Sequence, residues 1–297
     1  MNIVSKISND DTRIKDYFDL LKPRVMSLVI FTGICGMLLA PGVFSMHPLV
    51  AAIAILSLSF GAGAAGAFNM WYDRDIDAQM KRTKNRPIPS GKVPSAEALG
   101  FAVVVSLFSV MLMGMATNWV AAGLLAFANF FYSVIYTMWL KRSTSQNIVI
   151  GGAAGAFPPM IGWAAVTGDV TLYPVLLFLI IFMWTPPHFW ALALYSNDDF
   201  TKAKLPMLPV THGAAHTKWQ MLIYTLVLTA ITLLPFVLGY AGLIYGITAL
   251  ILNGFFILSN VNVLKEKQGF KQAKLMFAYS IFYLFAIFGA LVIDHFV

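Results

Sequence analysis

The sequence has little charge and almost no cysteine. Of its 297 residues, only 11% are charged and 59% are hydrophobic, and the mean hydropathy is +0.76. Soluble domains contain about 25% charged and about 45–50% apolar residues. The composition therefore excludes an ordinary soluble domain and indicates a membrane protein. The single cysteine, Cys35, has no partner within the chain for a disulfide, and we expect it to pack inside the membrane region.

Signals for cleavage or import are also missing. The first 22 residues contain Asp10, Asp11, Asp16 and Asp19, whereas mitochondrial transit peptides are poor in acids. No short apolar stretch with a cleavage site precedes the first long apolar segment. We therefore expect a retained first span and a multi-pass protein of the bacterial plasma (inner) membrane.

Long apolar segments occupy most of the chain. A membrane span needs about 20 apolar residues, and nine such segments fit the sequence. They lie at 25–44, 48–71, 97–117, 119–139, 148–167, 171–194, 219–240, 242–263 and 275–293. The predicted fold class is an all-α integral membrane protein with nine transmembrane helices in one bundle.

The basic residues fall on one side of this predicted bundle. All 20 Lys and Arg residues lie in alternate polar segments, at 6–24, 74–92, 141–142, 202–218 and 265–274. The intervening segments carry none. By the positive-inside rule, the N-terminus is cytoplasmic and the C-terminus external. This distribution explains the net charge of +7 without nucleic acid as a partner. We expect residues 1–22 to form a cytoplasmic N-terminal segment and residues 23–297 a single transmembrane domain.

The acidic residues gather at the same predicted face. Asp73, Asp75 and Asp77 follow span two, and Asp198 and Asp199 follow span six. An even number of spans separates these two groups, so both emerge on the cytoplasmic side. A transporter or channel usually places ionisable residues in mid-span, and the predicted spans hold almost none.

Three oxygen-bearing side chains around the end of span two follow a helical repeat. Asn69, Asp73 and Asp77 are spaced i, i+4, i+8, which places them on one helix face, about 6 Å apart along the axis. Mg²⁺ prefers a few carboxylates and keeps its other positions for water and substrate phosphate. Asp75 points away from this row. The alternative interpretation is a helix end that simply carries solvated charge.

Basic residues follow each acidic group. This order fits a metal-bridged diphosphate, in which carboxylates hold the metal while Lys and Arg bind the remaining phosphate oxygens. The candidate catalytic and metal-binding residues are Asn69, Asp73, Asp77, Asp198 and Asp199. The candidate diphosphate-binding residues are Lys81, Arg82, Arg86, Lys141, Arg142, Lys202 and Lys204. The predicted site lies in the cytoplasmic loops 72–96 and 195–217.

One histidine lies close to the cytoplasmic end of span six. If the chain is helical from His188 to Asp198, His188 lies about 15 Å deeper than the carboxylates. Its imidazole could contact an acceptor, ligate iron or transfer a proton. A buried histidine that is satisfied by a neighbour is the alternative interpretation.

Several strings in this order carry a family resemblance. They are the Asn69–Asp77 row, Leu21–Val25, Arg82–Pro87, Ile148–Pro159, Trp184–Ala193 and Pro206–Val210. The chain resembles the UbiA-type superfamily of intramembrane prenyltransferases and, within it, the protohaem IX farnesyltransferase (haem O synthase) branch. The adjacent Asp198 and Asp199 depart from an evenly spaced acidic row, which leaves open which of the two binds metal.

The resemblance implies a reaction and its partners. Farnesyl diphosphate, haem b and water would give haem O and diphosphate, with Mg²⁺ as cofactor and His188 as a haem-binding residue. The lipid bilayer and a downstream membrane enzyme that modifies haem O are the other expected partners. Three alternatives stay open: a prenyltransferase acting on an aromatic or quinone precursor, a haem or metabolite transporter, and an oxidase assembly factor without chemistry of its own.

Overall fold

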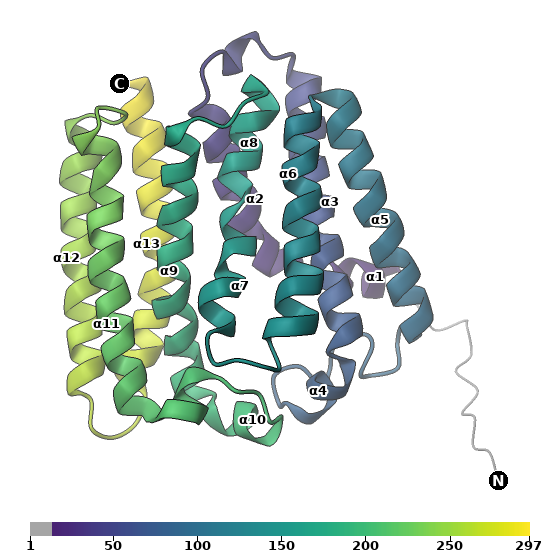
Figure 1. Cartoon of the computed structure of the whole chain (residues 1–297), viewed down its shortest axis with the longest axis vertical. Helices are drawn as coiled ribbons and strands as arrows, with labels where there is room; N and C mark the ends of the chain where they lie inside the picture. Colours follow the sequence, from purple (N-terminus) through teal and green to yellow (C-terminus); the bar gives the residue numbers. More distant parts are fainter. Residues whose placement is uncertain (1–13) are drawn as a thin grey trace.

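The computed structural model describes residues 14–297, and the first 13 residues lie outside it. All regular structure in the described chain is helical, and the helices pack side by side in one bundle (Figure 1). The first half contains α1 (Ile14–Leu20), α2 (Pro23–Leu38), the short η1 (Val43–Ser45), α3 (Pro48–Tyr72), α4 (Arg74–Gln79), α5 (Ser95–Ala116), α6 (Trp119–Phe130) and the π-helix η2 (Phe131–Leu140). The second half contains α7 (Asn147–Ala156), α8 (Pro158–Thr167), α9 (Leu172–Tyr195), α10 (Asn197–Lys202), α11 (Leu208–Val237), α12 (Leu243–Lys265) and α13 (Lys271–Phe296).

Eight helical segments in the described chain are long and apolar enough to cross a membrane. Two of these segments are composite, because η2 continues α6 and α8 continues α7. A ninth span exists if α1 and α2, which are bent by 61° relative to each other, together form a broken span. The predicted all-α membrane fold is confirmed, whereas the count of nine depends on this bent pair and stays a prediction.

Two predicted boundaries differ from the helices. The first predicted span, 25–44, contains a helix that ends at Leu38 and has only 16 residues, about 24 Å long, which is short for the ~30 Å hydrocarbon core. The seventh, 219–240, belongs to a helix that begins at Leu208 and is broken at Gly213, where φ is 81° and ψ is 166°. Hydropathy misplaced the start of α11 because its first turns contain polar residues. It misplaced the end of α2 because the apolar run continues past Leu38 into the loop.

Helices α2 and α8 meet backbone to backbone at the centre of the bundle. A Cβ atom on Gly162 would lie 2.0 Å from the Gly33 carbonyl oxygen, and one on Gly36 would lie 2.0 Å from the Pro159 carbonyl oxygen. Only glycine permits this approach, which is typical of close helix packing in membranes. The contact joins the first and second halves of the chain.

Buried hydrogen bonds join the last three helices. The Asn253 Nδ2 donates to Thr232 Oγ1 at 2.8 Å, and the Tyr283 hydroxyl donates to Asn253 Oδ1 at 2.8 Å. The Tyr245 hydroxyl donates to the Thr232 carbonyl at 2.6 Å. Side chains of α11, α12 and α13 thus satisfy one another inside the apolar region, and α13 is held where it packs on α9.

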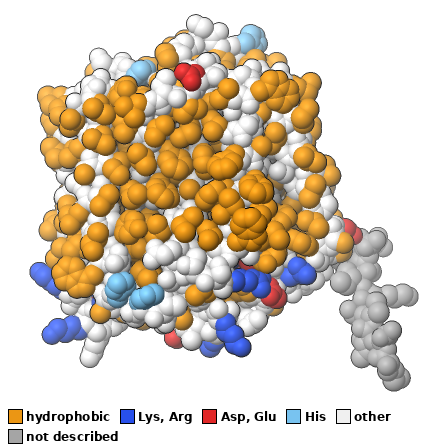
Figure 2. Space-filling view, viewed as in Figure 1, with side chains coloured by type: hydrophobic (Ala, Val, Ile, Leu, Met, Phe, Trp, Pro, Cys, Tyr) orange, Lys and Arg blue, Asp and Glu red, His pale blue; other side chains and the backbone are white. Residues whose placement is uncertain are grey.

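Charge is concentrated at one end of the bundle. In Figure 2 the visible Lys and Arg side chains lie along the lower edge, below a broad hydrophobic belt. The short helices α4 and α10 lie at this lower end, and the C-terminus lies at the other (Figure 1). The structure therefore brings the two predicted loops, 72–96 and 195–217, to the same end. The cytoplasmic assignment of that end stays a prediction.

Candidate active site

The predicted row of Asn69, Asp73 and Asp77 lies on an almost continuous helical path. Helix α3 ends at Tyr72, Asp73 joins it to α4, and the i, i+4 backbone bonds continue through the junction. The Asp73 amide donates to the Asn69 carbonyl at 3.0 Å, and the Asp77 amide donates to the Asp73 carbonyl at 2.8 Å. The three side chains are buried, with exposed fractions of 4%, 0% and 2% in chain order. Burial of two carboxylates requires partners for their charge.

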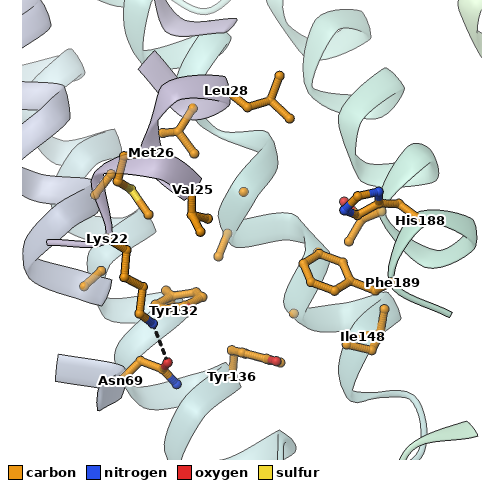
Figure 3. A pocket seen from close by; sticks show the side chains of 18 of the residues that line it. Lys22, Val25, Met26, Leu28, Asn69, Tyr132, Tyr136, Ile148, His188 and Phe189 are labelled. Carbon is orange, nitrogen blue, oxygen red and sulfur yellow. Dashed lines mark hydrogen bonds between the residues drawn. The ribbon is translucent and has the colours of Figure 1, made fainter. Parts of the chain in front are cut away.

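The nitrogen and the oxygen of the Asn69 side-chain amide both make hydrogen bonds. Its Nδ2 donates to Asp73 Oδ2 at 2.7 Å and to Thr137 Oγ1 at 3.2 Å. Its Oδ1 accepts a hydrogen bond of 2.8 Å from the ammonium of Lys22 (Figure 3). These partners fix the orientation of the amide, with the oxygen directed toward Lys22 and the nitrogen toward Asp73.

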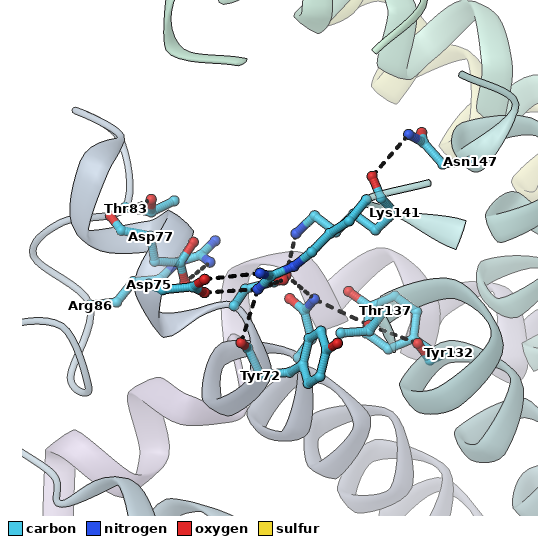
Figure 4. A network of polar contacts seen from close by, with 12 residues as sticks. Tyr72, Asp75, Asp77, Thr83, Arg86, Tyr132, Thr137, Lys141 and Asn147 are labelled. Atoms are coloured by element: carbon cyan, nitrogen blue, oxygen red, sulfur yellow. Dashed lines mark hydrogen bonds and ion pairs between the residues drawn. The ribbon is translucent and has the colours of Figure 1, made fainter. Parts of the chain in front are cut away.

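Each carboxylate of the row pairs with a cation from another segment (Figure 4). Asp73 Oδ2 accepts from the Lys141 ammonium, and Asp73 Oδ1 lies 3.5 Å from Arg142 Nη2. Asp77 Oδ2 accepts from Arg86 Nη1 at 2.7 Å. The cations come from the loop after η2 and from the loop after α4. The site thus combines the row, the nearby loop after α4 and the loop after η2, which is distant in sequence.

Asp75 lies outside this row and faces solvent. Its two oxygens accept hydrogen bonds of 2.8 and 2.9 Å from the Arg142 guanidinium, and its side chain is 58% exposed. This fork lowers the pKa of Asp75 and raises the pKa of Arg142. Arg142 therefore bridges the exposed Asp75 and the buried Asp73, and it ties the loop after η2 to α4.

The π-helix η2 brings two tyrosines to the site. Thr137 Oγ1 donates to the Tyr132 carbonyl at 2.8 Å, and the Tyr132 and Tyr136 rings lie 5.4 Å apart. A Cβ atom on Gly151 of α7 would come within 2.1 Å of the Tyr136 ring, so this glycine makes room for the tyrosine. π-Helical segments are rare and occur frequently at functional sites.

An elongated cavity of about 360 Å³ begins at this polar cluster and continues between the helices. Its polar end is lined by Lys22, Asn69, Asp77, Arg82, Arg86 and Lys141, followed by Tyr132 and Tyr136. Its apolar part is lined by residues that include Leu28, Leu58, Leu125, Ile161, Ile181, Trp184, His188 and Leu284. In Figure 3, Lys22 and Asn69 lie on one side of the cavity and His188 and Phe189 on the other. The cavity thus combines a cationic mouth with a hydrophobic interior.

His188 lies in the apolar part of the cavity, about two turns before the end of α9. Its ring stacks between Trp184 and Phe277, with centroid distances of 4.2 and 4.5 Å. Its Nδ1 lies 2.6 Å from Ser280 Oγ, and this hydroxyl donates its hydrogen to the Phe277 carbonyl at 2.7 Å. In the tautomer that carries its proton on Nδ1, the imidazole donates to this hydroxyl and the Nε2 lone pair is available. A neighbour therefore satisfies one nitrogen of His188 and leaves the other available.

This cavity and its polar mouth can be compared with known proteins. Residues 29–285 match the UbiA prenyltransferase family. The chain belongs to this family. Two similar relatives carry the name protoheme IX farnesyltransferase. The one from Rhodopseudomonas palustris (strain BisB5) is 56% identical over 95% of this chain and 90% of its own length. The one from Parvibaculum lavamentivorans is 58% identical over 94% of this chain and 88% of its own length.

Solved structures show the same fold. A digeranylgeranylglyceryl phosphate synthase superposes with a TM-score of 0.79 at 20% identity, covering 95% of this chain and 98% of that one. A UbiA homologue from Archaeoglobus fulgidus, bound to DMAPP and Mg²⁺, superposes with a TM-score of 0.64 at 17% identity, covering 92% and 99%. This UbiA-family chain therefore has the architecture of intramembrane prenyltransferases.

The second acidic group of this UbiA-family chain lies apart from the row. Asp198 is exposed and Asp199 half-buried in α10, and within the described chain neither carboxylate makes an ion pair or lines the cavity. Arg82 lines the mouth within electrostatic range of both loops. Although exposed at the mouth, it is surrounded by enough protein that desolvation lowers its pKa, and the charge of Arg86 lowers it further, whereas the charges of Asp77 and Asp199 raise it.

Four predicted phosphate ligands do not line the cavity, and one of them, Arg142, pairs with Asp73 and Asp75 instead. Lys81, Lys202 and Lys204 are exposed and do not line it. Lys22 was not among the predicted site residues, yet its ammonium bonds directly to the row. Its position at the elbow between α1 and α2, with φ at 52°, could not be read from hydropathy. The signal for it was the Leu21–Val25 string, which places a lysine and a proline immediately before an apolar span.

The donor atoms of the row suit a hard cation. Among the described residues, no three His, Cys, Asp or Glu side chains lie close enough to hold a metal ion by themselves. The row adds the amide oxygen of Asn69 to the carboxylates of Asp73 and Asp77, all buried beside basic side chains. Mg²⁺ requires few protein ligands when phosphate and water complete its shell. The residues therefore fit Mg²⁺ that is bound together with a diphosphate.

Proposed function

We propose that this chain transfers the farnesyl group of farnesyl diphosphate to a vinyl group of haem b, with addition of water, to give haem O and diphosphate. The observation that carries the proposal is the cavity itself, which joins a cationic mouth beside the Asn69–Asp77 row to an apolar interior containing His188. The name of the relatives, protoheme IX farnesyltransferase, supports the same donor and acceptor.

The cationic mouth is the proposed diphosphate site. Arg82, Arg86 and Lys141 line it, and Arg and Lys are the usual partners of phosphate oxygens. Asn69, Asp73 and Asp77 would hold Mg²⁺, which when bound supplies positive charge to the departing diphosphate. Asp198 and Asp199 would contribute to metal and diphosphate binding from the side of the mouth where Arg82 lies. Lys81, Lys202, Lys204 and Arg142 would raise the positive potential around it.

The reaction separates charge, and the residues of the cavity suit both charges. The allylic C–O bond breaks, and its electron pair leaves with the diphosphate toward the cationic mouth. The vinyl π electrons then form the new C–C bond to the farnesyl carbon. The carbon next to the porphyrin ring takes the oxygen of water, which loses one proton. The rings of Tyr132 and Tyr136 face the cavity between the two regions, where they would stabilise the allylic cation.

His188 is the proposed contact to haem. Its Nδ1 is engaged by Ser280, and its Nε2 is available on a ring held between two aromatic side chains. A neutral imidazole that carries its proton on Nδ1 offers Nε2 as a good ligand for iron. The apolar surroundings would bind the porphyrin and exclude bulk water from the cation.

The proposed membrane and partners follow from this chemistry. The basic end of the bundle would face the cytoplasm of a bacterial cell at the plasma membrane, where soluble Mg²⁺ and diphosphate exchange freely. Haem O would stay in the bilayer and pass to a membrane enzyme that modifies it further.

Incubation of the purified protein with Mg²⁺, haem b and farnesyl diphosphate tests the proposal, with mass spectrometry of the pigment. We expect a product heavier than haem b by one farnesyl group and one hydroxyl group. A parallel reaction with an aromatic acid in place of haem tests the quinone-precursor alternative. A prenylated aromatic acid without any haem O would overturn the proposed acceptor. Uptake of haem into vesicles without any change in its mass would favour a transporter.

A further inference from the structure

The side chain of Lys22 crosses from the elbow between α1 and α2 to the row on α3. The elbow is held by backbone bonds of 2.9 and 3.0 Å from the Val25 and Met26 amides to the Lys22 carbonyl. The stem of Lys22 passes over Gly66, where a Cβ atom would come within 3.4 Å of Lys22 Cδ. The ammonium then reaches Asn69 Oδ1 at 2.8 Å. Backbone and packing together aim this lysine at the amide oxygen.

Every side chain of the row already has a protein cation on its oxygen. Lys22 occupies Asn69, Lys141 occupies Asp73, and Arg86 occupies Asp77. A metal ion would need the Asn69 Oδ1 and Asp73 oxygens that these cations occupy, whereas Asp77 Oδ1 makes no ion pair within the described chain. A metal ion can therefore use Asn69 and Asp73 only if Lys22 and Lys141 move away or share these oxygens.

The charge of the mouth favours an anion over a bare cation. Lys22, Arg82, Arg86 and Lys141 line it, whereas Asp77 is the one lining carboxylate among the described residues, with the buried Asp73 behind it. An excess of positive charge repels a divalent cation and attracts a polyanion. A diphosphate supplies strong acceptors for the ammonium groups.

We propose that Lys22 is a further diphosphate-binding residue and that it exchanges partners when substrate arrives. Its ammonium leaves Asn69 Oδ1 for a phosphate oxygen, and the freed amide oxygen becomes available to the metal. Lys141 makes the same exchange from Asp73. Metal and diphosphate then bind with positive coupling, and each raises the affinity of the other by the same factor. The inference rests on the proposed function, because it assumes that the mouth binds a metal–diphosphate pair.

The test uses the full chain in detergent, with Mn²⁺ as the probe metal and a non-hydrolysable farnesyl thiodiphosphate as the anion. Electron paramagnetic resonance of free Mn²⁺ gives the affinity for the metal alone and for the metal with the analogue present, corrected for complex formation in solution. In the wild-type chain, we expect the analogue to tighten Mn²⁺ binding by about tenfold or more.

Removal of the Lys22 ammonium separates its effect on Mn²⁺ affinity from its effect on analogue affinity. In Lys22→Met, we expect Mn²⁺ alone to bind severalfold more tightly, because the amide oxygen is free, and the analogue to bind about tenfold more weakly, because a phosphate contact is lost. Lys141→Met should act in the same directions, and Lys22→Arg should keep most of the analogue affinity. Lys267→Met, an exposed lysine in the loop before α13, is the matched control and should change neither affinity.

The direction in which Mn²⁺ affinity changes in the variants decides whether the lysines exchange partners. If Lys22→Met and Lys141→Met both weaken Mn²⁺ and analogue together, the lysines only support the fold and the exchange is wrong. Unchanged affinities in both variants would also overturn it. Formation of haem O by the wild-type chain is independent of these results. A wild-type chain that couples Mn²⁺ to the analogue but makes no haem O would overturn the proposed acceptor and leave the exchange standing.

Discussion

Asp73 and Asp75 are two residues apart and differ in burial and in most of their partners. Asp73 is fully buried and accepts from Asn69 and Lys141, whereas Asp75 is 58% exposed and pairs only with Arg142. We expect Asp73→Asn to abolish haem O formation, since the loss of a metal ligand removes several kcal/mol of leaving-group stabilisation, and Asp77→Asn to behave alike. Asp75→Asn is the matched control and should retain most activity. Steady-state turnover with Mg²⁺ measures all three.

Metal removal checks the same assignment without mutation. Turnover should stop in EDTA and return when Mg²⁺ is added in excess. Activity that is unchanged in EDTA, or in the Asp73→Asn/Asp77→Asn double variant, would remove the metal role of the row.

His188 offers a second prediction at the scale of one residue. His188→Ala should lose haem binding, while the farnesyl thiodiphosphate still binds with Mg²⁺, because the histidine lies in the apolar part of the cavity, away from the polar mouth. Ser280→Ala should shift the haem absorption spectrum less strongly, since the ring stays stacked but loses its Nδ1 partner. Paired titrations of each variant with haem and with the analogue measure both effects. Wild-type haem affinity in His188→Ala would show that this histidine only packs α9.

The row was predictable because helical spacing is a local property of the sequence. The partners of the row were predictable only in part. Arg86 and Lys141 belong to the predicted basic set and do contact the row, whereas Lys81 and Lys202 are exposed. Which lysine turns inward depends on loop geometry, and composition contains no information about that. The same reason explains why Lys22 was missed.

At the scale of helices, the contact of α2 with α8 should be the least tolerant of added volume. Gly162→Ala would place a methyl group 2.0 Å from the Gly33 carbonyl oxygen, so the helices must separate. We expect a loss of stability of about 1–3 kcal/mol, measured as a lower unfolding temperature in detergent. Gly123→Ala on α6 meets no atom within 4 Å and should leave the unfolding temperature unchanged or slightly higher. Equal stability of the two variants would contradict the close packing.

Hydropathy located these helices well because a membrane span requires a long apolar run. It could not reveal the π-helical turn at Phe131–Leu140, the elbow before α2, or the short α10. Each of these is fixed by tertiary contacts, such as the space that Gly151 leaves for Tyr136. These irregular elements surround the cavity, whereas the regular spans form its frame.

At the scale of the whole molecule, the basic residues predict which end faces the cytoplasm. Reporter fusions at Asp169 and Gly242 should be external, and fusions near Lys84, Arg142 and Lys204 should be cytoplasmic. These positions alternate between the two ends of the described bundle. A cytoplasmic signal at Asp169 would contradict the predicted nine-span topology.

The cavity has one end among charged loops and the other among apolar helices, and this polarity has a consequence for what happens after a turnover. In the proposed reaction, the diphosphate would form at the end nearest water and could diffuse away into it. The farnesylated pigment would form at the hydrocarbon end, and its added apolar tail would make it less soluble in water than haem b. The two products would therefore depart into different phases, and dilution of the diphosphate into the aqueous phase would disfavour the reverse reaction.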